Sequence, residues 1–427
     1  MLITINNKKF TDNSKEANSE VAFVYSSQNE KFCDDAKANN CVDLIPSRKL
    51  KDYVDFSSIK IIGITGTNGK TTTAAAIYSI LLDLGYKVAL QGTRGFFIND
   101  EKVEDYTLTT PVQLANFAHI QKAIDNKCDF FVTEVSSHAI EQKRIEGIEF
   151  ELKVHTNITR DHLDYHKTIE EYINVKNSFF NDDSKKLINK DDKVVKFNTK
   201  NAYTYSLENP STYKVTAYSF KNGMHVMFSN IEKMNAFSSS MMGIFNIYNL
   251  MAAIASVHLT TNKTLDEICE AVENFAGVSG RMEIVSVDPL IIIDFAHTPD
   301  GMKEVYESFN HKDIITVFGA GGDRDKEKRP LMGKLAANFA KHIIVTSDNP
   351  RFEDPDLIIE DICKAIPNKD NLTIEVNRKE AIKKGIDLAK QNKNSVLLIL
   401  GKGDEPYQII YDKKLPLVDK DEVLKHI

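Results

Sequence analysis

The feature that most constrains the fold is the run GITGTNGKTTT, residues 63–73, which follows the apolar stretch IKII and opens a helical pattern. A glycine-containing turn between a buried strand and a helix directs backbone N–H groups at anions, so it predicts phosphate binding. The spacing differs from the common phosphate loop, because counting back from Gly69 and Lys70 reaches Ile64 where that loop has its first glycine. A turn that merely caps the helix is the alternative, but Gly-Lys-Thr at such a junction favours a nucleotide site.

Within this loop, Gly66 and Gly69 allow the backbone to close around phosphates. Lys70 can reach the β- and γ-phosphates, and the Thr71 hydroxyl can bind Mg²⁺. We therefore expect ATP to contact a continuous set of residues: Gly66, Thr67, Asn68, Gly69, Lys70, Thr71 and Thr72.

From residue 58 onward, apolar strands alternate with helical patterns, which predicts an α/β protein with mostly parallel sheets. Residues 185–240 break this pattern with short polar strands, KVVKFNTK and YKVTAYSF, which we expect to be antiparallel. A second α/β series begins near residue 290, and its strands end in polar or glycine-rich residues, where open sheets bind ligands. We expect a small N-terminal α/β domain at 1–57, a central P-loop-type ATPase domain at 58–285 and a Rossmann-like C-terminal domain at 286–427.

The bulk properties exclude several classes of protein. A net charge of −7 argues against nucleic-acid binding but not against a locally positive site for a small anion. The five cysteines form no C-x-x-C pair, which argues against a zinc site or a disulfide framework and fits a reducing compartment. The start MLITINNKKF lacks the apolar segment of a signal peptide, and the chain has no 18-residue apolar run. We expect a cytoplasmic monomer without membrane insertion.

The segment TEVSSHAIEQKR follows a buried strand and carries oxygen and nitrogen groups suited to an anionic substrate. Glu134 stands at the strand end, where its carboxylate can bind Mg²⁺, an ion that prefers oxygen ligands. The alternative is that Glu134 is a solvated strand end. The residues that follow Glu134 include four hydrogen-bond donors: Ser136, His138, Gln142 and Arg144.

The run HTNITRDHLDYHK concentrates polar groups where another strand ends: Asn157, Asp161, His162, Asp164 and His166. Among them, His162 is a candidate second ligand for Mg²⁺. Lys176 follows on a helix, and its local sequence indicates nothing more than a surface lysine.

Two later segments carry further candidates for the ATP site. Asn246 and Asn249 lie three residues apart on a helix, where amides can contact adenine or phosphate, although helix-capping or exposed amides are an equal alternative. Arg281 is a candidate contact of the γ-phosphate, and Asp294 and His297 stand at the end of a strand in the last domain.

The compressed loop GTNGKTT resembles that of the Mur ligases and their relatives, the folylpolyglutamate synthetases. At least six motifs follow in the order of that family, over about residues 58–427. The resemblance implies an ATP-dependent ligase that forms an amide bond through an acyl phosphate, with two Mg²⁺ ions. It further implies that Lys176 is carbamylated and joins Thr71, Glu134 and His162 around the metals. Lys70 is implied as a catalytic group. The residues implied to lie near ATP are Asn246, Asn249, Arg281, Asp294 and His297.

The resemblance also implies the substrates, UDP-N-acetylmuramoyl-L-alanyl-D-glutamate and an amino acid. Residues implied for the uridine-diphosphate muramyl substrate are Ser14, Thr109, Thr110, Ser136, His138, Gln142 and Arg144. The N-terminal part is short compared with many family members, and only TDNSKE, with Ser14, resembles their uridine-binding segment.

The motifs GGDRDKEKRPLMG, TSDNPRFEDP and LGKGDEPYQII resemble the amino-acid site of Mur ligases that add the third peptide residue. The resemblance implies that meso-2,6-diaminopimelate binds at Arg324, Asp348, Asn349, Pro350, Arg351, Gly401 and Glu405. Diaminopimelate has one carboxylate more than lysine, and arginine binds carboxylates through two parallel hydrogen bonds. Without the family match, DNPR could equally be a turn followed by an exposed arginine. The chain has Asp404 where this family usually has histidine, which leaves the local electrostatics open.

Three alternatives compete with this hypothesis. The nearest is the same reaction with L-lysine as the added residue. A folylpolyglutamate synthetase is less consistent with the motif DNPR, residues 348–351, and with the combination of TTP, residues 109–111, and EVSSH, residues 134–138. A nucleotide-dependent switch or binding module would need the phosphate loop but not His162, Lys176 and Arg351 together.

Overall fold

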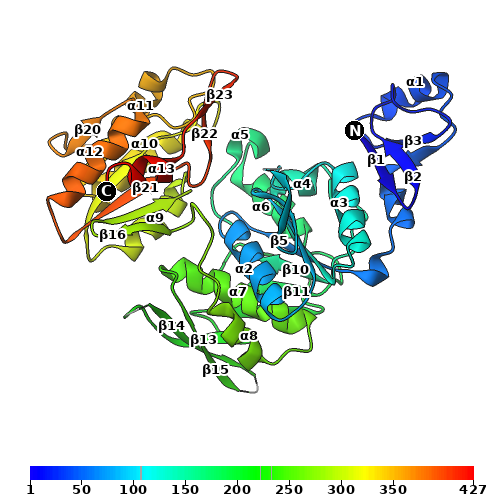
Figure 1. The fold of residues 1–427 in the computed structure, drawn as a ribbon, viewed down its shortest axis with the longest axis horizontal. Coiled ribbons are helices and arrows are strands. Elements are labelled where there is room, and N and C mark those ends of the chain that lie inside the picture. The colour runs from blue at the N-terminus through cyan, green and yellow to red at the C-terminus, as the bar shows by residue number, and fades with distance from the viewer. Residues whose placement is uncertain (106–107, 222, 232) are drawn as a thin grey trace.

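A computed structural model describes residues 1–105, 108–221, 223–231 and 233–427. Within the described ranges, three large sheets and one two-stranded sheet follow one another along the chain, and Figure 1 shows the large sheets in three bodies, with the central one between the N-terminal and C-terminal ones. This arrangement is the α/β architecture expected from the alternation of strands and helices. Among the described residues, no helix is long and apolar enough to cross a membrane.

The N-terminal body is a sheet of order β1-β2-β3-β4, in which only the β1–β2 pair is antiparallel. Its strands and helical segments are β1 (Leu2–Ile5), β2 (Lys8–Thr11), β3 (Val21–Tyr25), η1 (Glu30–Phe32), α1 (Cys33–Ala38), β4 (Leu44–Pro46), η2 (Ser47–Tyr53) and η3 (Phe56–Ser58). Ile5 and Phe10 are fully buried and share one hydrophobic cluster with Phe117 and Ile120 of α3 (Gln113–Asp125). The small sheet is therefore attached to the central body through α3.

The central sheet has eleven strands in the order β15-β14-β13-β12-β11-β10-β5-β9-β6-β7-β8. Its strands are β5 (Lys60–Thr65), β6 (Val88–Gly92), β7 (Gly95–Ile98), β8 (Glu101–Asp105), β9 (Phe130–Glu134), β10 (Leu152–His155), β11 (Lys186–Asn189), β12 (Ala202–Ser206), β13 (Tyr213–Ser219), β14 (Met224–Asn230) and β15 (Met234–Ser239). The strands from β6 to β13 in this order pair in parallel, and both edges are antiparallel. β5 lies at the centre, where burial on both faces fits its apolar sequence.

The central helices cover the faces of this sheet and carry its connections. Besides α3 they are α2 (Lys70–Asp83), α4 (Ser137–Glu141), α5 (Leu163–His166), α6 (Ile169–Ser178), α7 (Ile244–Thr260) and α8 (Leu265–Val272). α2 ends before Gly85, whose φ of +85° is a left-handed conformation in which the helix stops. α2 and α7 belong to one hydrophobic cluster, so the helix after the phosphate loop is fixed by core packing.

One expectation for this part is wrong. Residues 193–200, KVVKFNTK, form no strand, and β13 pairs in parallel with β12 and antiparallel with β14. The backbone of 193–200 bonds to side chains instead: the Val194 amide donates to Asp192 and the Lys196 amide to Asn177, both at 3.0 Å. Side-chain acceptors therefore replace the strand partner that the alternating pattern suggested.

The C-terminal sheet has the order β16-β17-β21-β18-β19-β20, and only β16 is antiparallel to its neighbour. Its strands are β16 (Glu283–Val287), β17 (Leu290–Asp294), β18 (Asp313–Phe318), β19 (His342–Val345), β20 (Leu372–Ile374) and β21 (Ser395–Leu400), and a separate hairpin joins β22 (Tyr407–Ile410) to β23 (Lys413–Pro416). The helices are α9 (Pro299–Ser308), α10 (Lys328–Phe339), α11 (Pro355–Cys363), α12 (Arg378–Lys390) and α13 (Asp419–Leu424). We propose that each sheet with its helices is one domain; the expected boundary at 285/286 then falls inside β16.

A buried ion pair joins two helices of the C-terminal body. The Arg378 guanidinium donates to both carboxylate oxygens of Asp419, at 2.8 and 2.6 Å, and to the Leu400 carbonyl at 3.1 Å. Both side chains are fully buried. The substitution Asp419→Asn should therefore destabilise this body by about 3–5 kcal/mol, because it leaves a buried cation without its counter-ion.

Chemical denaturation followed by circular dichroism would measure this loss. Glu375→Gln removes the exposed pair with Lys384 and serves as the control, with an expected change below about 1 kcal/mol. Equal stability of the Asp419→Asn and Glu375→Gln proteins would contradict the prediction.

Candidate active site

A cleft of about 910 Å³ lies between the central and C-terminal bodies. It brings together most residues that the sequence indicated, although they come from both bodies. The predicted residues that line it are Thr67, Asn68, Gly69, Lys70, Thr71, Thr72, Thr109, Glu134, His162, Asn246, Asn249, Arg281, Asp294, His297, Arg324, Asp348, Asn349, Arg351, Gly401 and Glu405.

The phosphate loop closes tightly at Gly69, which has a φ of +84°. A side chain there would meet Asn249, since an added Cβ would lie 2.3 Å from the Asn249 Oδ1 atom. Glycine is therefore required both for the left-handed backbone and for the approach of α7. α2 begins directly afterwards at Lys70, so its first-turn amides, which have no acceptor within the helix, face the cleft.

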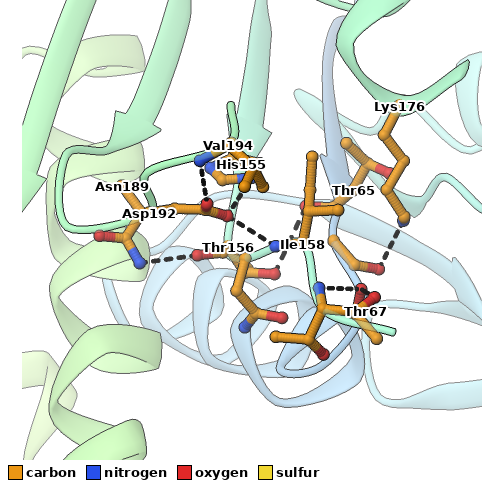
Figure 2. A network of polar contacts seen from close by, with 12 residues as sticks. Thr65, Thr67, His155, Thr156, Ile158, Lys176, Asn189, Asp192 and Val194 are labelled. Atoms are coloured by element: carbon orange, nitrogen blue, oxygen red, sulfur yellow. Dashed lines mark hydrogen bonds and ion pairs between the residues drawn. The ribbon is translucent and has the colours of Figure 1, made fainter. Parts of the chain in front are cut away.

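The residues that follow β10 form hydrogen bonds with the phosphate loop (Figure 2). The Thr67 amide donates to the Asn157 carbonyl at 2.7 Å, and the Thr156 hydroxyl donates to the Asn68 carbonyl at 2.7 Å. Asp192 supports these residues in turn, because its carboxylate accepts the Ile158 amide at 2.6 Å and lies 3.3 Å from His155. The loop is thus held by a polar network that the chain itself supplies.

Glu134 is buried, not a solvated strand end, and it faces the loop. Its carboxylate accepts the Thr71 hydroxyl at 2.9 Å and the Thr93 amide at 3.0 Å. A carboxylate and a hydroxyl oxygen beside each other are ligands that Mg²⁺ prefers, so these residues fit the ion that the family resemblance implies.

Lys70 and Lys176 donate hydrogen bonds to the same carbonyl. The Lys70 Nζ donates to the carbonyls of Gly66 at 2.7 Å and Thr67 at 2.9 Å, and the Lys176 Nζ donates to that of Gly66 at 2.8 Å. Lys176 is only 1% exposed, so it is not the surface lysine that its local sequence indicated. Burial, followed by the charge of Lys70, lowers the pKa of Lys176 well below its usual value.

His162 lines the cleft beside Asp161, whose carboxylate lies 3.4 Å from its ring. Burial, the largest cause, lowers the pKa of His162 to about 4, so its ring is neutral at pH 7 and can bind a metal. The carboxylate of Asp161 opposes this shift. His138 packs edge-on against the His162 ring, with centroids 4.9 Å apart.

The residues expected at the muramyl substrate form a group that adjoins Glu134. The Thr110 hydroxyl donates to the Glu134 carbonyl at 2.9 Å, and the Ser136 amide donates to that hydroxyl at 2.9 Å. Arg144 donates to the Thr110 carbonyl at 2.9 Å and to Gln142 at 2.7 Å. Ser14 is not brought to this group: it lies between β2 and β3, in the N-terminal body.

The asparagines of α7 are buried rather than exposed. Asn249 donates to Asn246 at 3.0 Å, and Asn246 donates to the Met242 carbonyl at 2.7 Å. The Arg281 guanidinium lies over the Phe295 ring, 4.0 Å from its centroid. Asp294 accepts the Met282 and Ala296 amides, both at 2.7 Å, so it orders the segment between the two bodies.

The C-terminal wall of the cleft carries charges of both signs. Asn349 donates to Glu405 at 2.8 Å, and Arg351 donates to the Gly322 carbonyl at 2.7 Å. Burial, followed by the charge of Asp348, raises the pKa of Glu405. Burial, followed by the charge of Arg324, lowers the pKa of Arg351. Carboxylates therefore stand beside guanidinium groups, which suits a ligand with both ammonium and carboxylate groups.

Sequence reasoning missed several residues of the cleft. Thr93, in the turn between β6 and β7, bonds to Glu134 and to Thr109, and only its position after a buried strand could have indicated it. Lys328, at the start of α10, lines the cleft and has its pKa lowered by burial. Asp404, which the sequence singled out, does not line the cleft; its carboxylate accepts a hydrogen bond from Arg94 at 2.9 Å, which joins the central and C-terminal bodies.

Comparison with known proteins decides the family. Residues 64–257 match the Mur ligase middle domain, and residues 280–403 match the Mur ligase, glutamate ligase domain. The chain belongs to the Mur ligase family. It is therefore an ATP-dependent ligase that forms amide bonds, as the motifs in the sequence implied.

The relatives described next match this Mur ligase over most of its length and of their own. A protein of Wolinella succinogenes is 52% identical over 97% of this chain and 95% of its own length, and one of Helicobacter hepaticus is 49% identical over 94% and 89%. Both are named UDP-N-acetylmuramoyl-L-alanyl-D-glutamate–2,6-diaminopimelate ligase. A solved structure with that same name is 29% identical, covers 98% of this Mur ligase and 94% of its own chain, and has a TM-score of 0.69.

Proposed function

We propose that this Mur ligase joins meso-2,6-diaminopimelate to UDP-N-acetylmuramoyl-L-alanyl-D-glutamate in peptidoglycan synthesis, with ATP as the energy source. The observation that carries the proposal is the charge pattern on the C-terminal wall of the cleft, where Arg324 and Arg351 lie near Asp348 and Glu405. Diaminopimelate has two ammonium and two carboxylate groups, so it can neutralise both sets. Lysine lacks one carboxylate and would leave an arginine unpaired, which is costly in a partly desolvated site.

The chemistry begins with activation of an acid. An oxygen of the substrate's D-glutamate γ-carboxylate attacks the γ-phosphorus of ATP, the bond from that phosphorus to the β,γ-bridging oxygen breaks, and ADP leaves. The resulting acyl phosphate is attacked by an amine of diaminopimelate. The tetrahedral adduct then loses a proton and expels phosphate, which leaves the amide. This activation is necessary because an unactivated carboxylate is a poor electrophile.

The protein contributes mainly position and charge. Lys70 and the first-turn amides of α2 would bind the β- and γ-phosphates, after the Lys70 ammonium exchanges its present carbonyl partners for phosphate oxygens. Arg281 enters the cleft from the linking segment and is suited to the γ-phosphate. Thr71, Glu134 and His162 would hold Mg²⁺, which supplies positive charge against the phosphate oxygens when bound.

Lys176 fits the proposed carbamate because burial, followed by the charge of Lys70, lowers the pKa of its amine well below the usual value, which favours the neutral form. A neutral amine can add CO₂ and release a proton, which turns this side chain into an anion. Such an anion would counter the charges of Lys70 and a second Mg²⁺. We also propose that the enzyme works in the cytoplasm as a monomer.

The proposal is tested by supplying purified enzyme with ATP, the muramyl dipeptide nucleotide and either meso-diaminopimelate or L-lysine. We expect phosphate release and a product of the corresponding mass with diaminopimelate, and much slower release with lysine. Equal or faster turnover with lysine would favour the lysine-adding alternative, and no turnover with either would contradict both.

Arg351→Ala should raise the KM for diaminopimelate by about 100-fold, because a charge-assisted, two-pronged contact with a carboxylate in a partly desolvated site is worth roughly 3 kcal/mol. The KM for ATP should stay within about twofold of the native value, since the proposed ATP residues are elsewhere in the cleft. Steady-state phosphate release gives both constants. An unchanged KM for diaminopimelate would place its carboxylates elsewhere.

A further inference from the structure

The two arginines proposed to bind carboxylates stand on different loops. Arg324 follows β18 in the loop before α10, and Arg351 lies in the turn between β19 and α11. The two side chains lie close together, because a Cβ on Gly321 would come within 2.9 Å of the Arg351 Nη1 atom and 3.8 Å of the Arg324 Cγ atom. The charge of Arg324 contributes to lowering the pKa of Arg351. Their spacing therefore needs support from groups outside the pocket.

The backbone at both loops is held in an unfavourable conformation. Asp323 has a φ of +53° and Arg351 a φ of +52°, values that residues with side chains rarely adopt. The loops also lie very close together, because a Cβ on Gly322 would come within 1.9 Å of the Pro350 carbonyl oxygen. The Gly322 amide donates to the Asn349 carbonyl at 2.9 Å. Such strain persists only where neighbouring contacts fix it.

Glu353 supplies contacts that reach both loops. One carboxylate oxygen accepts the Asp323 amide at 2.6 Å and the Arg329 Nη2 at 2.9 Å. The other accepts the Arg329 Nη1 at 3.1 Å and lies 2.9 Å from the Lys326 Nζ. Glu353 belongs to the turn of Arg351, so its carboxylate ties that turn to the loop of Arg324. Hydrogen bonding from Arg329, the largest cause, lowers the pKa of Glu353 to about 2, and the group is ionised at neutral pH.

Arg329 connects Glu353 to the helices α10 and α11. Its side chain is 1% exposed and also donates to Asp361 of α11 at 3.1 Å. Because Arg329 lies in the first turn of α10, its two-pronged contact with Glu353 joins α10, α11 and both loops. Neither Arg329 nor Glu353 lines the cleft, so neither is placed to contact a substrate.

We infer that Arg329 and Glu353 are positioning residues that fix the spacing between Arg324 and Arg351, and that this spacing sets the preference for an amino acid with a second carboxylate. The inference rests on the proposed function. It predicts that weakening the Arg329–Glu353 pair changes recognition of diaminopimelate more than it changes turnover.

Glu353→Gln tests the inference because glutamine keeps the shape of the side chain but removes its charge. We expect the KM for diaminopimelate to rise about tenfold, which corresponds to about 1.4 kcal/mol, while kcat stays within about twofold. The KM values for ATP and for the muramyl nucleotide should be unchanged, and selectivity over lysine should fall about tenfold. Glu375→Gln, in an exposed ion pair of the same body, should leave all of these constants unchanged.

Arg329→Lys keeps the charge but loses the two-pronged contact, so we expect a KM shift in the same direction should Glu353→Gln fail to fold. A folded Glu353→Gln enzyme with native KM and selectivity would overturn the inference, and so would a uniform loss of kcat without a KM shift. A native enzyme that does not use diaminopimelate would instead overturn the proposed function, which keeps the two failures distinct.

Discussion

Lys70→Ala should lower kcat by about 10³-fold, since one preorganised charge on a transferring phosphoryl group is typically worth that much. The side chain begins α2 at the edge of the cleft, and its ammonium already lies within 2.9 Å of two loop carbonyls. Removing it leaves the first-turn amides of α2 in place but takes away the positive charge that we propose acts on the γ-phosphate. The KM for ATP should therefore change less than kcat does.

Phosphate release at saturating substrates measures this effect. Lys200→Ala, which removes an exposed ion pair with Asp183, is the matched control and should keep native turnover. A Lys70→Ala enzyme with kcat within tenfold of the native value would show that the loop amides and other cations suffice.

Lys176→Ala should lower kcat by at least about 100-fold if a carbamate on this side chain takes part in the arrangement of charges. The prediction depends on burial, because Lys176 is 1% exposed and its pKa is lowered by burial and then by the charge of Lys70, which favours the neutral amine that reacts with CO₂. Native enzyme equilibrated with ¹³C-labelled bicarbonate should then give a carbamate carbon signal in the NMR spectrum. Lys176→Ala enzyme should lack that signal.

Two results would contradict the role of Lys176. One is full turnover of Lys176→Ala without added bicarbonate or chloride. The other is an identical ¹³C spectrum for the native and variant proteins. Lys153→Ala is a useful control, because Lys153 is also a buried lysine of the central body but is ion-paired with Asp182 and lies outside the cleft.

The sequence predicted elements well where one physical requirement dominated. The loop at Gly66–Thr72 and the helix after it follow from glycine positions and apolar periodicity, and both appear as expected. The failure at residues 193–200 has a different cause: the alternation there resembled a strand, but Asp192 and Asn177 offered acceptors that the pattern could not reveal. Ser14 was assigned by resemblance, and the structure leaves it in the N-terminal body, so its role stays a prediction.

The sequence by itself determined the α/β class and the glycine-containing loop that opens α2, because these depend on local spacing and on the backbone freedom of glycine. Only the tertiary structure decided that Lys176 is buried against the Gly66 carbonyl, that Glu134 meets Thr71 and Thr93, and that Glu353 ties two distant loops together. The physical reason is that burial and charge coupling depend on neighbours far apart in the chain. Solvent exposure, and with it protonation, is therefore set only after the sheets and helices have packed.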